Sequence, residues 1–186
     1  MTVPAVAVHA SRRRSERDAA DPVGAVGRNQ GRALVSVILS ALWAGAALIV
    51  VATVAPAAFR VLPTRSLAGA LVGQVLPVLF ITGVIVGTLS VVLTPSGAPR
   101  RMLRRVGGVG TLLGCLVAQA IIGPKIDGLR QRIGPSVEAL ATTDPLRVEF
   151  GRLHGISVLA LGTAMIFALV TLVGAAMAVR EAPPLD

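Results

Sequence analysis

Tyrosine is absent from the 186-residue chain, which contains one tryptophan, four phenylalanines and one cysteine, and only 15% of its residues are charged. Soluble domains carry about a quarter of their residues as charges, so a charge content this low with 54% hydrophobic residues excludes an ordinary soluble protein. The single cysteine, Cys115, excludes an intramolecular disulfide and a cysteine-rich metal site. Because charges are scarce, the places where they do occur are informative.

Four long stretches of the chain contain no charged residue. They are residues 33–59, 66–99, 106–124 and 153–179. Because about 20 mostly apolar residues cross the ~30 Å hydrocarbon layer as a helix, each stretch can span a membrane. The stretches do not alternate apolar with polar residues, which excludes a transmembrane β-barrel. The sequence therefore predicts an all-α integral membrane protein, folded as a four-helix up-and-down bundle.

The ends of the spans are marked by arginine, glycine and proline. We expect a transmembrane domain at residues 33–180, with spans near residues 34–56, 67–93, 106–122 and 153–179. Residues 1–32 show no sustained apolar period and are predicted to form a disordered basic tail, followed at the other end by a short tail at 181–186. Pro77 should kink the second span. The sequence Gly123-Pro124-Lys125 is a strong stop signal for the third.

The loop at residues 125–152 is the only long one, and it should contain a helix of its own. Ile126, Leu129 and Ile133 recur at helical spacing. This pattern predicts a short amphipathic helix on the membrane surface, ended by Gly134 and the proline after it.

The last helix is expected to begin outside the membrane. Asp144 followed by Pro145 is typical of an N-cap and a first helical position, so this helix should run unbroken from Pro145 to Val179. Mostly small residues recur in it at alternating spacings of three and four, which predicts a seam that faces the other helices. The seam consists of His154, Ser157, Leu161, Ala164, Ala168, Thr171 and Ala175.

Other small residues form pairs four positions apart, which we interpret as packing contacts between helices. These pairs are Gly69 and Gly73, Gly83 and Gly87, Gly110 and Gly114, Gly151 and Gly155, and Gly174 and Ala178. Thr111, Cys115 and Gln119 similarly mark one face of the third span.

The distribution of basic residues predicts the orientation. With four spans, the N-terminal tail, the second loop and the C-terminus share one side, which holds 11 basic residues against seven on the other. The positive-inside rule therefore places both termini in the cytoplasm of a multi-pass protein of the cell membrane.

The up-and-down topology brings most of the unusual polar residues to the extracytoplasmic end of the bundle. A small polar vestibule there is the candidate site for a ligand, although helix ends are in general more polar than helix middles. The candidate ligand-binding residues are Arg60, Gln74, Gln119, Lys125, His154 and Ser157.

Several short segments carry a family resemblance. They are Trp43-Ala44-Gly45, residues 54–60 with Leu62-Pro63, Ala68-Gly69, residues 76–80, Gly123-Pro124-Lys125 and residues 150–157. With these segments the chain resembles the transmembrane-protein-205-like domain family over about residues 36–173. The resemblance implies a small four-helix membrane domain whose biochemical activity is not established.

The absence of certain residue types from the spans also excludes several classes of function. No span contains Asp or Glu, which disfavours ion-coupled transport, and no nucleophile, base and orienting group can be assembled into a catalytic site. We therefore expect a non-enzymatic protein with no catalytic residue, cofactor, bound metal or nucleic-acid partner. Its expected partners are the lipid bilayer, a second copy of the chain and a small molecule. The alternative is a haem- or metal-associated redox protein that uses His154, the only histidine in the membrane region.

Overall fold

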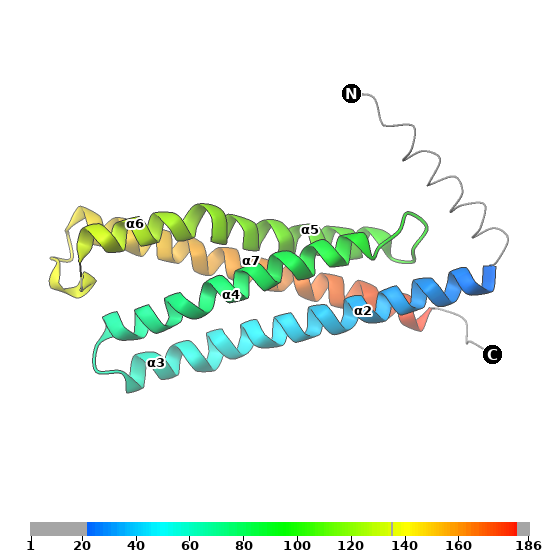
Figure 1. Cartoon of the computed structure of the whole chain (residues 1–186), viewed down its shortest axis with the longest axis horizontal. Coiled ribbons are helices and arrows are strands. Elements are labelled where there is room, and N and C mark those ends of the chain that lie inside the picture. Colours follow the sequence, from blue (N-terminus) through cyan, green and yellow to red (C-terminus); the bar gives the residue numbers. More distant parts are fainter. Residues whose placement is uncertain (1–21, 135, 182–186) are drawn as a thin grey trace, which may run out of the picture.

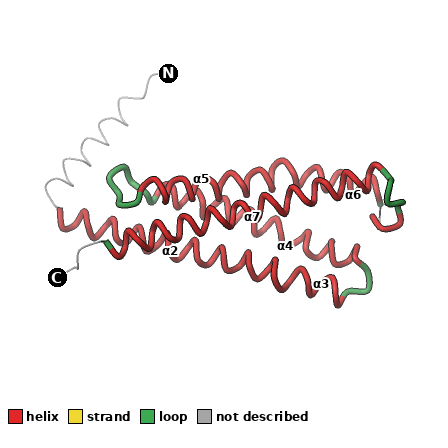
Figure 2. Tube along the Cα trace, turned by 180° about the vertical axis from the view of Figure 1, so that it is seen from behind, coloured by secondary structure: helices red, strands yellow, loops and turns green. Residues whose placement is uncertain are grey.

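The computed structural model describes residues 22–134 and 136–181, and in this part of the chain every regular element is a helix. The helices in chain order are α2 (Pro22–Ile49), the π-helical turn η1 (Val50–Val54), α3 (Ala55–Val61), α4 (Arg65–Val92), α5 (Arg101–Val117), the π-helical turn η2 (Ala118–Ile122), α6 (Gly123–Ile133), the 3₁₀ turn η3 (Val137–Ala139) and α7 (Pro145–Arg180). Figure 2 shows that loops are confined to the two ends of the molecule.

These elements form four long rods, because α2, η1 and α3 are continuous, as are α5, η2 and α6. Within the described residues, all four rods are long and apolar enough to cross a membrane. Consecutive rods run in opposite directions (Figure 1), so the prediction of an all-α, four-helix up-and-down bundle is confirmed. The chain is a multi-pass membrane protein.

Each rod packs against two neighbours. Helix α5 lies between α4 and α7, and α2 contacts α7 and α4, which closes a ring in the order α2, α4, α5, α7. We name the two ends of the bundle after arginines that lie there. The Arg104 end contains the loop at 93–100, the start of α2 and the end of α7; the Arg130 end contains residues 62–64, α6 and the loop at 134–144 (Figure 1).

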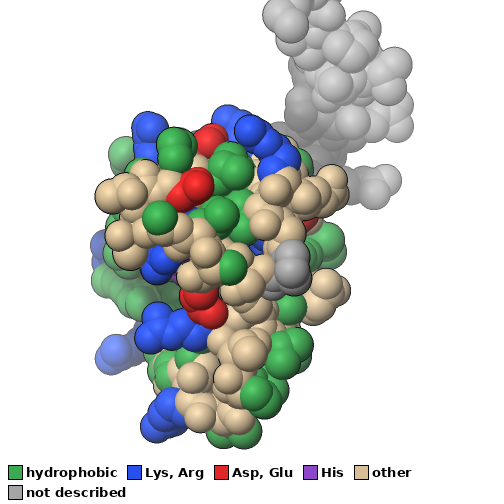
Figure 3. All heavy atoms as spheres, turned by 90° about the vertical axis from the view of Figure 1, so that its left-hand side faces the viewer, with side chains coloured by type: hydrophobic (Ala, Val, Ile, Leu, Met, Phe, Trp, Pro, Cys, Tyr) green, Lys and Arg blue, Asp and Glu red, His purple; other side chains and the backbone are tan. Residues whose placement is uncertain are grey.

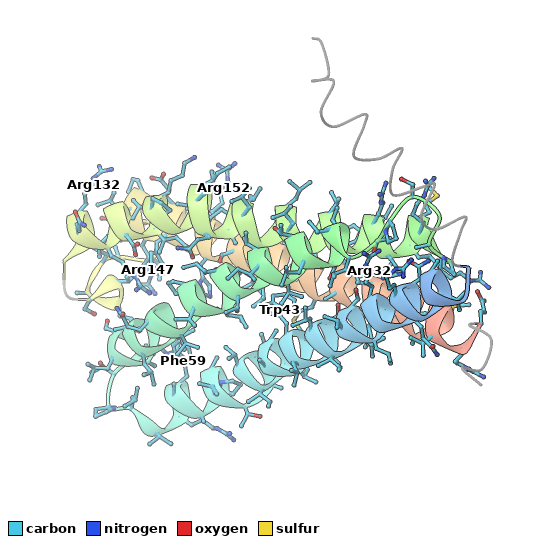
Figure 4. All side chains as sticks on the ribbon, turned by 45° about the vertical axis from the view of Figure 1, so that its right-hand side comes forward. Arg32, Trp43, Phe59, Arg132, Arg147 and Arg152 are labelled. Atoms are coloured by element: carbon cyan, nitrogen blue, oxygen red, sulfur yellow. The ribbon has the colours of Figure 1, made fainter. Side chains whose placement is uncertain are left out.

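The core between the rods is built around one large side chain. Trp43 of α2 is 4% exposed and points into the bundle (Figure 4), where its indole Nε1 donates a hydrogen bond of 2.9 Å to the carbonyl of Leu79. Phe80 and several alanines share this core with Trp43, and the small residues let the helices approach closely. A Cβ at Gly83 would lie 2.4 Å from Cys115 Sγ and 2.8 Å from the Trp43 ring. Close packing in this core therefore depends on glycine at that position.

The expected stop of the third span at Gly123-Pro124 is wrong, since the helix continues to Ile133. Just before Pro124 the backbone hydrogen bonds change from the α-helical to the π-helical pattern in η2. There the Gly123 N–H donates to the carbonyl of Ala118, five residues back. The same device, η1, precedes Pro56 in the first rod, which continues to Val61. Proline lacks an N–H and crowds the carbonyl four residues before it, and a π-turn relieves both problems without ending the helix. The predicted amphipathic helix therefore exists, but as a continuation of the third rod.

The helix ends elsewhere follow the sequence signals more closely. Helix α6 ends where predicted, with Gly134 at a positive φ of 83° that favours glycine. Helix α7 begins at Pro145, and Asp144 Oδ1 accepts a hydrogen bond of 2.8 Å from the Leu146 N–H. Helix α4 continues through Pro77.

The first rod begins earlier than the sequence indicates. Helix α2 starts at Pro22, so residues 22–32, expected in the tail, are helical; the remainder of that tail, residues 1–21, lies outside the described residues, as does 182–186. Most of residues 24–32 are half-buried, and Ala33 and Ser36 are buried about three and four turns after the start. Packing against the rest of the bundle therefore accounts for helix where the apolar pattern is weak.

The predicted seam of α7 is confirmed from Ser157 to Ala175, where all its members are buried. Its first member, His154, was expected to face the other helices and instead is exposed. The first turns of α7 pack on α6. The buried seam therefore begins at the next member, Ser157, one turn later than predicted.

Candidate binding site at the Arg130 end

The six candidate residues lie on all four rods towards the Arg130 end, where α3 packs on α4 and α6 packs on α7, and their side chains differ in environment. Arg60, Gln74, Lys125 and His154 are exposed, Gln119 is half-buried, and Ser157 is 7% exposed. Within residues 22–134 and 136–181, no hydrogen bond or ion pair joins any two of these six side chains. They share an end of the bundle without forming a hydrogen-bonded cluster.

Arg130 of α6 links three rods at this end. Its Nη2 donates a hydrogen bond of 3.1 Å to the carbonyl of Gly69 on α4. A Cβ at Gly73 would lie 2.7 Å from Arg130 Nη1, so the glycine pair leaves a notch in α4 that the guanidinium fills. The Arg130 Cζ also lies 5.7 Å from the ring centroid of Phe150 on α7, within the range of a cation–π contact.

Phe150 extends this contact towards His154. The two rings are nearly parallel, with an interplanar angle of 3° and centroids 6.3 Å apart, one turn from each other on α7. Arg130, Phe150 and His154 therefore form a continuous row from the α4 notch to the exposed surface. We call this row the Arg130 row.

The charge on Arg130 has no counterion in the described part of the chain, where no carboxylate lies within ion-pairing distance of it. The side chain is half-buried and makes one hydrogen bond, to a neutral carbonyl. A guanidinium has five N–H donors in a planar fork that matches a carboxylate or phosphate. The arrangement can therefore receive an anion.

The whole Arg130 end is basic. Its cations are Arg60, Arg65, Lys125, Arg130, Arg132, Arg147 and Arg152, against the four acids Asp127, Glu138, Asp144 and Glu149. Viewed end-on, Lys and Arg side chains lie along the upper and left edges of this face, with acidic groups nearer its middle (Figure 3). Arg132 and Arg147 lie at the tip of the bundle, and Arg152 lies farther along α7 (Figure 4). This distribution favours anions over cations as ligands.

Sequence reasoning missed Arg130 and Phe150 as site residues. Two signals pointed to Arg130: it follows Leu129 on the predicted amphipathic helix, and the pair Gly69 and Gly73 offered a notch. Phe150 begins one of the segments that carry the family resemblance. We interpreted the glycine pair as a helix packing contact, whereas it receives a side chain. Among the other pairs, Gly87 packs against the backbone of α5 and Gly110 and Gly114 pack against α7, while Gly151 and Gly155 meet nothing within 4 Å.

A second group of polar residues lies inside the bundle near the Arg104 end, and the sequence did not reveal it. Arg104 is 1% exposed; its Nη2 donates to the Leu93 carbonyl at 3.3 Å and its Nε has no partner. The buried hydroxyls of Ser40 and Ser90 also lack partners. Outside this core, the exposed pair Arg100 and Glu181 ties the 93–100 loop to the end of α7, and its hydrogen bond and charge hold the pKa of Glu181 below the ordinary glutamate value.

Metal-binding chemistry has few possible ligands here. Over residues 22–134 and 136–181 there is no group of three or more His, Cys, Asp or Glu side chains that could hold a metal ion. Cys115 is fully buried in the core beside Trp43 and Gly83.

Comparison with known protein families identifies the family of this chain. The model of a family described as "Domain of unknown function (DUF4149)" matches residues 38–134, which is more than half of the chain. The chain belongs to this family. The DUF4149 model covers the first three rods, from within α2 to the end of α6. The matched range includes the notch at Gly69 and Gly73 and also Arg130. Helix α7, with Phe150 and His154, lies beyond the matched range. No curated protein and no solved structure matches the chain.

Proposed function

We propose that this DUF4149 protein is a non-enzymatic membrane protein that binds an anionic ligand at the Arg130 end. The observation that carries the proposal is the half-buried Arg130 guanidinium, which bridges the Gly69 carbonyl and the Phe150 ring without a counterion in the described chain. An acidic group would supply the missing charge and take the free donors. Four of the candidate residues, Arg60, Lys125, His154 and Gln119, are the proposed polar surroundings of the ligand.

We also propose the orientation of the site. Both termini lie in the cytoplasm of the cell membrane and the Arg130 end faces outwards, which the bias of 11 basic residues against seven supports. Within DUF4149, the chain is proposed to be related to the transmembrane-protein-205-like domain. Several segments that carry this resemblance, among them Gly123-Pro124-Lys125 and residues 150–157, belong to the elements of the Arg130 end, which supports a functional role for that end.

The test uses two arginines of the same helix. Mass spectrometry of the protein purified in mild detergent should detect an acidic ligand, and Arg130→Gln should lower its occupancy about tenfold, since hydrogen bonds to charged groups contribute about 1.5–3 kcal/mol. Arg132→Gln is the control. Arg132 is exposed and lies two residues after Arg130, so this substitution removes the same charge without touching the notch. Equal occupancy in the two variants would contradict the proposal.

The ligand's source is separated by lipid exchange. An acidic metabolite should remain bound when all lipid is replaced by phosphatidylcholine, whereas an anionic headgroup should be lost and return when that lipid is added back. The same preparation tests the alternative function: a Soret absorbance band that disappears in His154→Ala would establish haem binding and overturn the proposal.

A further inference from the structure

A groove runs between α5 and α7 on the outer surface of the bundle. It has a volume of about 590 Å³. Its α5 wall contains Val106, Val109, Leu113 and Val117, all of them exposed, and its α7 wall contains Ala160 and Phe167. Apart from Thr163 of α7, the lining is apolar except at one end, where Arg105 lies.

The length of the groove matches one leaflet of a bilayer. Arg105 and Val117 are 12 positions apart on α5, which is about 18 Å along the axis at ~1.5 Å per residue. Half of a ~30 Å hydrocarbon layer is ~15 Å. The groove therefore begins near the Arg104 end, at the depth of the headgroups, and stops near the middle of the membrane.

This length argues against a helix from a second copy as the occupant, because such a helix would cross the whole layer. The two glycines in the lining of the groove are also engaged within the chain. A Cβ at Gly110 would lie 2.2 Å from the Phe167 ring, and one at Gly114 would lie 3.1 Å from the Ala164 Cβ. Helix α7 thus already occupies the close-packing face of α5.

The charge at the open end selects the headgroup. Arg105 donates through Nε and Nη2 to the Thr94 carbonyl at 3.1 and 3.0 Å, which fixes the guanidinium at the mouth of the groove and leaves Nη1 free. Within the described residues, the Arg104 end holds seven arginines and one acidic residue, Glu181, which pairs with Arg100. Such an excess of arginine attracts anionic lipids.

We propose that this groove, the Arg105 groove, binds one anionic phospholipid, with an acyl chain along α5 and α7 and the phosphate beside Arg105. The site is separate from the Arg130 end and does not depend on the function proposed there. Its occupant is a bilayer lipid, recognised by apolar contact over one leaflet and by one fixed guanidinium at the headgroup.

The experiment is native mass spectrometry of the protein released from nanodiscs that contain equal amounts of phosphatidylglycerol and phosphatidylcholine. One phosphatidylglycerol should be retained in preference. Arg105→Gln should reduce this retention about fivefold, whereas Arg105→Lys, which keeps the charge, and Arg65→Gln, which removes a charge at the opposite end, should retain it. Val109→Trp fills the groove and should also reduce retention, while Val158→Trp, exposed on α7 outside the groove, should not.

Three results would overturn the proposal. They are equal retention of the two lipids, equal effects of Val109→Trp and Val158→Trp, and a dimer without lipid that Val109→Trp dissociates, which would make a second copy the occupant. If Arg105→Gln does not fold, the comparison of lipid retention between Val109→Trp and Val158→Trp tests the proposal by itself. Arg130→Gln should leave this retention unchanged, so failure at one site is distinguishable from failure at the other.

Discussion

At the scale of single residues, close approach of helices depends on the absence of a side chain at a few positions. Gly83 faces Trp43 and Cys115, Gly87 faces the backbone of α5, and Gly107 faces Thr171 and the backbone of α7. Membrane helices gain little by hiding apolar surface from each other, so stability comes from such contacts and from hydrogen bonds like that of Trp43. Other helical glycines, such as Gly45 and Gly162, have nothing within 4 Å of the position that a Cβ would take.

This contrast gives a matched pair of substitutions. Gly83→Ala places a methyl group into Trp43 and Cys115 and should destabilise the bundle by about 1–3 kcal/mol, the usual cost of overpacking. Gly162→Ala, at a helical position with nothing within 4 Å, should be neutral or slightly stabilising. Thermal unfolding in detergent micelles measures both. Equal midpoints for the two variants would show that α4 does not pack on Trp43 as described.

The candidate site shows how far single residues could be read from the sequence. Polarity and topology identified the correct elements, because the ends of spans are where polar groups are tolerated. They did not identify Arg130, since the pairing of its guanidinium with Gly69 joins positions 61 residues apart. Likewise, His154 fitted the small-residue seam by spacing alone, and only its neighbours decide that it is exposed.

At the scale of elements, local chemistry fixes the helix ends and two π-turns allow helices to pass prolines. Asp144 caps α7 and Gly134 ends α6, both as predicted from residue type. The π-turns were missed because a proline after an apolar run indicates a stop in most helices. Here each proline is the second residue after a π-turn, and the helix continues.

The cap of α7 can be tested directly. Asp144→Ala removes the acceptor of the Leu146 N–H and should cost about 1 kcal/mol of local stability. Hydrogen exchange in the first turn of α7 should then accelerate by about fivefold. Thr143→Ala, at the exposed residue just before the cap, is the control and should not change exchange. Unchanged exchange in both variants would mean that the cap does not hold this turn.

At the scale of the whole molecule, loop 93–100 and loop 134–144 lie at opposite ends of the third rod. A crossing number of four, one for each rod, therefore places the two loops on opposite faces of the membrane. In a Cys115→Ser background, Gly97→Cys should react with a membrane-impermeant thiol reagent only after the cells are opened. Ala141→Cys should react in intact cells. Both positions are exposed. The reverse pattern would overturn the proposed orientation, and labelling of both from one side would overturn the crossing number.

The sequence by itself determined that the chain has four segments able to cross a membrane as helices, because long uncharged runs are stable in hydrocarbon only as helices whose backbone groups bond internally. It also determined several helix ends, which depend on residues adjacent in the chain. Only the tertiary structure decided which side of each helix faces its neighbours, and with it the notch that receives Arg130, the exposure of His154, the burial of Arg104 and the groove beside Arg105. These features arise where helices distant in sequence approach within van der Waals contact, and helical periodicity alone does not specify which helices meet.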